Sequence, residues 1–264
     1  MKLSELIWND GFFERKLKGF VFAVQDFFAL CRVTVASVGR KPRYPRELVF
    51  QMDYIGAGSV PIILLTGLFT GMVLALQSSV QLKLFGSSMY VGKLVALSMI
   101  KELGPVLSAL MVAGRVGSGI AAELGAMVDT EQIDAIKVEG SDPIKKLVVP
   151  RMLACVMMLP LLTVVSDTVG VLGGFFIAVT QLQIDPTFYW SSVFDTIKYS
   201  DIAVGMLKPC FFGFIIAMVG SYMGLNTSGG TAGVGRSTTE SVVHSSIIIL
   251  VTDFFLTKLF VYFT

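Results

Sequence analysis

Apolar runs of about twenty residues or more recur along the chain and dominate its pattern. They cover approximately residues 54–82, 94–122, 148–181, 202–225 and 242–263. A membrane-crossing helix needs roughly 20 mostly apolar residues, and every run supplies that length. The pattern therefore predicts an all-α membrane protein whose main domain, residues 47–264, contains five transmembrane helices.

The first 46 residues carry a different pattern, and we expect them to form a separate N-terminal region. Aromatic residues alternate there with cations, and no stretch is long and apolar enough to span a bilayer. The residues are Phe12, Phe13, Phe20, Phe22, Phe27 and Phe28, with Arg15, Lys16, Lys18 and Arg32. This mixture favours an amphipathic helix lying in the headgroup plane, and the alternative is a soluble helix packed on the bundle.

Basic residues are distributed unequally between the predicted connections. Nine lysines and arginines precede the first span, and the segment between the second and third spans adds Lys137, Lys145, Lys146 and Arg151. The connections on the opposite side hold Lys83, Lys93 and Lys198. Because cytoplasmic loops carry the excess of lysine and arginine, we expect a cytoplasmic N-terminus and a C-terminus on the outer side.

Composition narrows the class of protein further. Hydrophobic residues make up 54% of the chain and charged residues only 15%, with a mean hydropathy of +0.74. Soluble domains carry about 25% charged residues, so an ordinary soluble enzyme, a disordered chain and a nucleic-acid binder are excluded. One histidine and three widely spaced cysteines form no ligand pattern, and we expect no metal site and no cofactor.

Charged residues inside the predicted spans are the first candidate functional feature. Lys101 and Glu102 lie within the second span, shortly before Pro105, which breaks a helix because it has no N–H to donate. A charge at this depth costs about 2.5–3.5 kcal/mol on insertion scales. Lys208 in the fourth span is a candidate partner for Glu102. A structural ion pair and a polar cavity for a lipid head group both remain open.

The segment between the second and third spans is the second candidate. Asp129 is positioned to cap a short helix over residues 130–139, which Gly140 would end. A helix of this length is marginal in water, so it must dock either on its own bundle or on a cytoplasmic partner.

Two glycine patterns bear on packing and on ATP binding. Pairs four residues apart, Gly67 with Gly71, Gly170 with Gly174 and Gly220 with Gly224, favour close helix packing and an oligomer. The glycine-rich segment 229–236 is expected to be a flexible turn. The chain contains no P-loop pattern, so ATP hydrolysis by this chain is not expected.

A longer motif then resembles a known family. The stretch 101–125, KELGPVLSALMVAGRVGSGIAAELG, resembles the signature of MlaE/YrbE-type permeases. The segments TEQIDAI at 130–136 and TTESVVHSS at 238–246 resemble it too, as does Asp253. The resemblance extends over approximately residues 48–260.

This resemblance implies a transport function and a set of partners. Family members are multi-pass permease subunits in the bacterial inner membrane, part of ABC transporters that move phospholipid between the inner membrane and the periplasm or outer membrane. The permease is expected to form a homodimer. Its expected partners are a separate cytoplasmic ATPase, an MCE-domain lipid-binding ring in the periplasm and, in some systems, a small STAS-type subunit.

The resemblance also assigns residues, none of them catalytic. It implies that the lipid contacts Lys101, Glu102, Lys208, Leu74, Leu82 and Leu103. It implies that the short coupling helix and its surroundings contact the ATPase through Glu123, Asp129, Thr130, Glu131, Ile133, Asp134 and Ile136.

Two other functions are compatible with the pattern of charges. A proton-coupled secondary carrier of an amphipathic substrate would use Asp167 or Glu102, because intramembrane acids can relay protons. A membrane scaffold would transport nothing. Co-purification with an ATPase distinguishes the permease from both.

Overall fold

The computed structural model describes residues 10–42, 44–84 and 90–263, and these residues form helices without any β-strand. Residues 1–9 of the predicted N-terminal region lie outside the described part. The helices are α1 (Asp10–Ser37), α2 (Pro45–Leu84), α3 (Val91–Ser98), η3 (Met99–Leu103), α4 (Gly104–Val112), η4 (Ala113–Gly117), α5 (Ser118–Asp129), α6 (Gln132–Val138), η5 (Ile144–Val148), α7 (Val149–Thr180), α8 (Pro186–Thr196), α9 (Tyr199–Leu225) and α10 (Gly230–Phe263).

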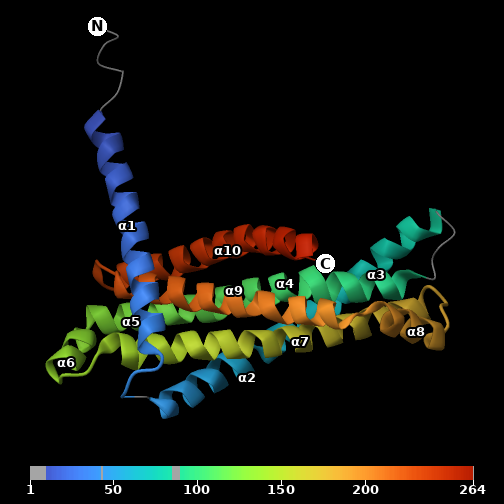
Figure 1. The fold of residues 1–264 in the computed structure, drawn as a ribbon, viewed down its shortest axis with the longest axis horizontal. Helices are drawn as coiled ribbons and strands as arrows, with labels where there is room; N and C mark the ends of the chain where they lie inside the picture. Colours follow the sequence, from blue (N-terminus) through green and yellow to red (C-terminus); the bar gives the residue numbers. More distant parts are fainter. Residues whose placement is uncertain (1–9, 43, 85–89, 264) are drawn as a thin grey trace, which may run out of the picture.

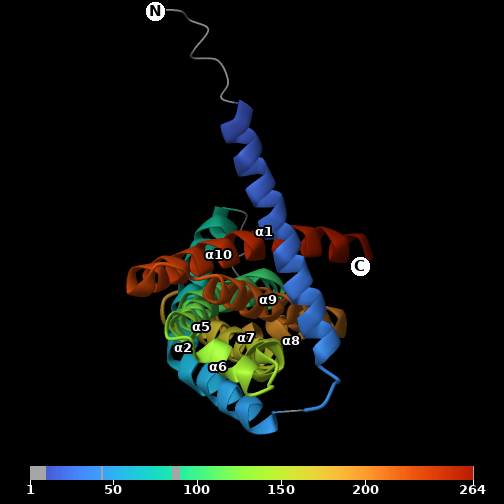
Figure 2. The ribbon, with the colours of Figure 1, turned by 90° about the vertical axis from the view of Figure 1, so that its left-hand side faces the viewer.

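The predicted transmembrane helices are confirmed. Among the described residues, five helical segments are long and apolar enough to cross a membrane: 45–84, 91–129, 144–180, 199–225 and 230–262. The second segment is interrupted by η3 and η4, two short stretches of wider π-helix. The segments run along the long axis of the molecule, and α10 crosses the others obliquely (Figures 1 and 2).

The fifth span begins earlier than its apolar run predicted. The expected turn over residues 229–236 is wrong, because α10 is already helical from Gly230. Glycine is more frequent in membrane helices than in soluble ones, so it does not end this helix. Gly233 also lies against the carbonyl of Ser228, where a side chain would overlap.

The glycine pairs bring helices together within the chain. A methyl group on Gly71 of α2 would overlap the backbone carbonyl of Gly170 on α7. Gly220 on α9 similarly lies against the carbonyl of Gly117. The predicted close packing is therefore confirmed, but these surfaces are used inside one chain and give no argument for an oligomer.

Helix α1 lies across the direction of the spans near the end of the bundle that carries α5 and α6 (Figures 1 and 2). Its Phe27 ring contacts the Tyr222 ring edge-on at 5.6 Å between centroids. Phe22 and Phe28 are exposed, and the side chains of residues 10–17 and 20 are outside the described set. The direction of α1 suits a helix parallel to a membrane surface, and its contact with lipid stays a prediction.

The short helix α6 forms, but it does not begin as predicted. Asp129 is the last residue of α5 and not a cap of α6. Thr130 ends α5, and both its N–H and its hydroxyl donate to the Ala126 carbonyl. Glu131 precedes α6 in a left-handed conformation, with φ of 58° and no side-chain cap. The predicted end is confirmed, since Gly140 has a φ of 77° and Ser141 N–H donates to the Ile136 carbonyl.

Candidate functional site

The break in the second span creates a free backbone acceptor. In a regular α-helix the Lys101 carbonyl accepts a hydrogen bond from the N–H of residue 105, but that residue is proline. The helix is wider over η3, where the Gly104 N–H donates to the carbonyl of Met99, five residues earlier, and not to the carbonyl four residues earlier. The ammonium of Lys208 donates to the freed Lys101 carbonyl at 2.9 Å. A side chain from another span thus satisfies the acceptor that the proline leaves open.

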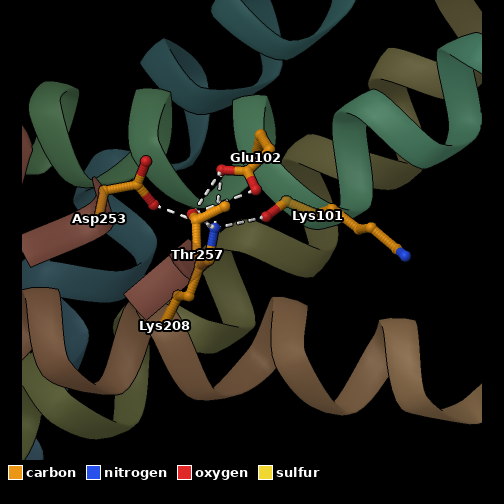
Figure 3. Close-up of polar contacts among 5 residues, drawn as sticks. All are labelled: Lys101, Glu102, Lys208, Asp253 and Thr257. Atoms are coloured by element: carbon orange, nitrogen blue, oxygen red, sulfur yellow. Dashed lines mark hydrogen bonds and ion pairs between the residues drawn. The ribbon is translucent and has the colours of Figure 1, made fainter. Parts of the chain in front are cut away.

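Lys208 is the centre of a polar cluster within the spans (Figure 3). Its side chain is 1% exposed. Its ammonium lies 2.7 Å from a carboxylate oxygen of Glu102 and 3.1 Å from one of Asp253, and it donates to the hydroxyl of Thr257 at 2.8 Å. That hydroxyl lies 3.2 Å from both Glu102 oxygens. The predicted partnership of Lys208 and Glu102 is therefore present.

Lys101 does not join this cluster through its side chain. The side chain points away from Lys208 (Figure 3) and forms an ion pair with Asp201 at 2.7 Å. The Lys101 side chain is 40% exposed, whereas Asp201 is buried. Two charged arrangements consequently lie side by side along α9, one at Asp201 and one at Lys208.

The cluster is partly open and not enclosed in protein. The Glu102 side chain is 41% exposed. A hollow of about 70 Å³ is lined by Lys101, Glu102, Asp201, Val204, Lys208, Thr257, Phe260 and Val261. A polar group from a ligand can therefore approach Glu102 and Lys101, while Lys208 is reached only through its partners.

The three leucines predicted to line a lipid cavity do not all line the same hollow. Leu74 and Leu103 line a separate hollow of about 370 Å³ together with Phe69, Thr70, Val73 and Gln77. Leu82 packs in the same apolar cluster as both leucines but does not line that hollow.

The predicted coupling residues differ in what they contact. Ile133 is buried at 7% exposure, Ile136 is half-buried and Asp134 forms an exposed ion pair with Lys137 at 2.8 Å. Glu123 forms an ion pair with the buried Arg151 at 2.7 Å, which joins α5 to α7. Asp129 at the end of α5 is exposed, as are Thr130 and Glu131 in the turn that follows it.

Sequence reasoning missed three residues of the site. Asp253 was noted as part of the family resemblance but not as a contact of Lys208, and Thr257 and Asp201 were not considered. Asp253 and Thr257 are four residues apart and therefore lie on one face of α10, which was an available signal. Their contact with Lys208 depends on how α10 crosses α9, and the sequence does not show that angle.

Comparison with known proteins decides the family. The family model described as Permease MlaE matches residues 48–259, most of the chain. The chain belongs to the MlaE permease family. It is a multi-pass membrane permease rather than an enzyme, and the predicted resemblance is confirmed.

Relatives extend this MlaE-family assignment across several bacteria. A probable ABC transporter permease protein of Rickettsia felis is 41% identical over 91% of this chain and 93% of its own length. A Synechocystis protein of the same description is 40% identical over 94% and 91%. The intermembrane phospholipid transport system permease protein MlaE of Haemophilus influenzae is 38% identical over 89% and 94%.

Proposed function

We propose that this MlaE-family chain is the membrane-spanning subunit of an ABC transporter that moves phospholipid between a bacterial inner membrane and the periplasm or outer membrane. The names of the relatives in Rickettsia and Haemophilus support this function. The observation that carries it is the accessible charged cluster around Glu102, Lys101 and Lys208 inside an otherwise apolar bundle.

The cluster suits a zwitterionic or anionic head group. The Lys101 side chain is accessible within the second span and offers a cation to a phosphate. Glu102 offers a carboxylate to an ammonium or hydroxyl group. Lys208 holds Glu102 in place from the buried side. The hollow at Leu74 and Leu103 offers an apolar surface to acyl chains. Head group and chains would thus contact different parts of the second span.

The proposal requires an external source of energy at the α6 end. A cytoplasmic ATPase would dock on α6, with the N-terminus in the cytoplasm and the C-terminus in the periplasm. The exposed side of this helix includes Asp134, Ala135 and Val138. Because Ile133 packs inward, movement of α6 is transmitted to α5 and so to the span that carries Glu102.

Other partners complete the proposed assembly. A second copy of the permease would pair with the first, since exposed apolar side chains such as Phe69, Leu65, Phe254 and Ile247 cover α2 and α10. An MCE-domain ring would receive or deliver the lipid on the periplasmic side, and some assemblies would include a STAS-type subunit on the ATPase.

The head-group role of Lys101 is tested by exchanging charges. The double variant Lys101→Asp/Asp201→Lys keeps an ion pair at this position but removes the accessible cation. The complex is purified in mild detergent, its subunits and bound lipids are identified, and ATP-dependent phospholipid transfer is measured in proteoliposomes. We expect normal assembly with at least a tenfold loss of transfer.

The same assay separates the competing functions. Unchanged transfer by the double variant would contradict the head-group role. Transfer that needs a pH gradient and no ATP would establish the secondary carrier instead, and purification without an ATPase or lipid would favour the scaffold. Each single variant serves as a control, because it leaves two like charges together and should impair assembly itself.

A further inference from the structure

A further cavity lies between α7, α8 and α9. It has a volume of about 370 Å³ and is bordered by α7, α8 and the first turns of α9, with Ile100 of η3 at one side. Its lining is almost entirely apolar and includes Val171, Leu172, Trp190, Phe194 and Met206. This size and lining are those of a small-molecule site, which typically occupies about 300–1,000 Å³.

One acid stands in this apolar lining. Among the described residues that line the cavity, Asp167 alone is ionisable. Its Oδ1 atom is buried and accepts no hydrogen bond, although a buried polar atom without a partner is costly. The hydroxyls of Thr163 and Thr168 donate to carbonyls of their own helix, at 2.9 and 2.8 Å. The nearby hydroxyls therefore do not satisfy the carboxyl.

The neighbouring helix is shaped around this carboxyl group. Asp167 Oδ1 lies so close to Gly104 that a methyl group there would overlap it. Gly104 follows the π-helical stretch and precedes Pro105, which leaves the Lys101 carbonyl without its helical donor. The second span therefore makes room for the Oδ1 atom but supplies no hydrogen-bond donor to it, and a ligand in the cavity meets the rest of the carboxyl group.

The cavity is distinct from the charged cluster. Gly205 of α9 lines the cavity and lies against the carbonyl of Ile100, where a side chain would overlap. This contact between α9 and η3 separates the Asp167 side from the side where Lys208 meets Glu102. A ligand in the cavity would therefore not occupy the proposed phospholipid site.

We propose that this cavity binds a long-chain alcohol, or a lipid-soluble molecule of the same chemistry, with its hydroxyl group on Asp167. A hydroxyl both donates and accepts hydrogen bonds, so it matches a carboxyl group in either protonation state. It also adds no second charge to the apolar surroundings, which an ammonium would do. The apolar body of the ligand fills the space between Leu172, Trp190 and Phe194. This binding does not depend on the transport function.

The test is photolabelling of the full chain in lipid nanodiscs with a diazirine derivative of hexadecanol. Labelled peptides are mapped by mass spectrometry. Unlabelled hexadecanol and its methyl ether, which has no hydroxyl group to donate, are each tested as competitors of the label. We expect labels on residues 163–172 and 190–197. We also expect hexadecanol to displace the label about tenfold more effectively than the ether, the effect of one hydrogen bond of about 1.4 kcal/mol.

Matched variants locate the binding and identify the acid. Asp167→Leu should remove the preference for hexadecanol over the ether, and Met206→Trp should fill the cavity and abolish labelling. A hollow of about 340 Å³ between α2 and α4, lined by Leu65, Thr66, Phe69, Thr70, Leu107 and Met111, contains no ionisable residue and gives the control Met111→Trp. That variant should keep the labelling.

Three outcomes would overturn the inference. They are equal labelling of both hollows, equal displacement by hexadecanol and the ether, and a label that Met206→Trp does not reduce. The ether comparison uses the unaltered protein, so it decides the question even if Asp167→Leu fails to fold. Loss of phospholipid transfer in other variants would leave this result unchanged.

Discussion

Glu102 and Asp253 lie on different spans, yet both carboxylates contact the ammonium of Lys208, at 2.7 and 3.1 Å. One base therefore serves two acids. Removing Lys208 leaves two carboxylates without a cation, whereas removing either acid leaves an ion pair intact. The three residues should consequently respond very differently to substitution.

We predict that Lys208→Met lowers the free energy of unfolding by about 3–5 kcal/mol, the usual result of breaking a buried ion pair from one side. Glu102→Gln and Asp253→Asn should each cost about 1–3 kcal/mol. The triple variant Lys208→Met/Glu102→Gln/Asp253→Asn should recover much of the loss, because no charge remains unpaired. Thermal unfolding in mild detergent measures each effect.

Lys258→Met provides the control for this series. Lys258 is an exposed lysine on α10, the span that carries Asp253, so its replacement should leave the unfolding temperature nearly unchanged. A triple variant no more stable than Lys208→Met would contradict the view that unpaired charge causes the loss.

A second prediction concerns the two sides of α6. Ile133 is 7% exposed and Val138 is 89% exposed. Ile133 therefore packs against the rest of the chain, whereas Val138 faces outward. Val138→Asp should leave the permease folded but reduce ATPase retention at least tenfold in co-purification. Ile133→Asp should lower the stability of the permease itself, because it buries a charge.

Size-exclusion chromatography separates these two effects. Lys137→Ala is the control, since it removes only an exposed pair with Asp134, worth less than about 1 kcal/mol. Full ATPase retention by Val138→Asp would show that the ATPase does not dock on this side of α6.

A third prediction concerns the contact between α2 and α7. Gly71→Ala places a methyl group on the Gly170 carbonyl and should cost about 1–3 kcal/mol through overpacking. Gly114→Ala, at a helical glycine with nothing within 4 Å of the added group, should be neutral or stabilising by up to about 1 kcal/mol. Equal effects on thermal unfolding would contradict the close approach of α2 and α7.

A fourth prediction concerns Glu123, which the family resemblance connected with the ATPase. Because Glu123 pairs with the buried Arg151, Glu123→Gln should reduce stability by about 1 kcal/mol or less, given that the glutamate is half-exposed. It should retain the ATPase in co-purification. Loss of the ATPase with unchanged stability would restore a direct docking role to Glu123.

Sequence reasoning predicted the spans well because membrane crossing depends on the length and polarity of a run. The Lys208–Glu102 contact was also predictable, since unpaired charges within spans need partners. The start of α10 was not, because glycine has a low helix propensity in water but is frequent in membrane helices.

The remaining site residues depend on how helices cross. Lys101 and Glu102 are adjacent in sequence, but their side chains reach different partners, Asp201 and Lys208. Both partners lie on α9, about two turns apart, so the path of η3 past α9 decides which side chain reaches which. No local pattern records that path, so the sequence could not divide the cluster in two.

The bond from Lys208 to the Lys101 carbonyl has a mechanical consequence. An ordinary helix closes every turn with its own backbone and bends as a unit, but this one is closed at residue 101 by an amine from α9. Sliding α9 by the length of a single hydrogen bond would leave the Lys101 carbonyl without a donor. At this break the second span is therefore held by its neighbour as well as by its own backbone.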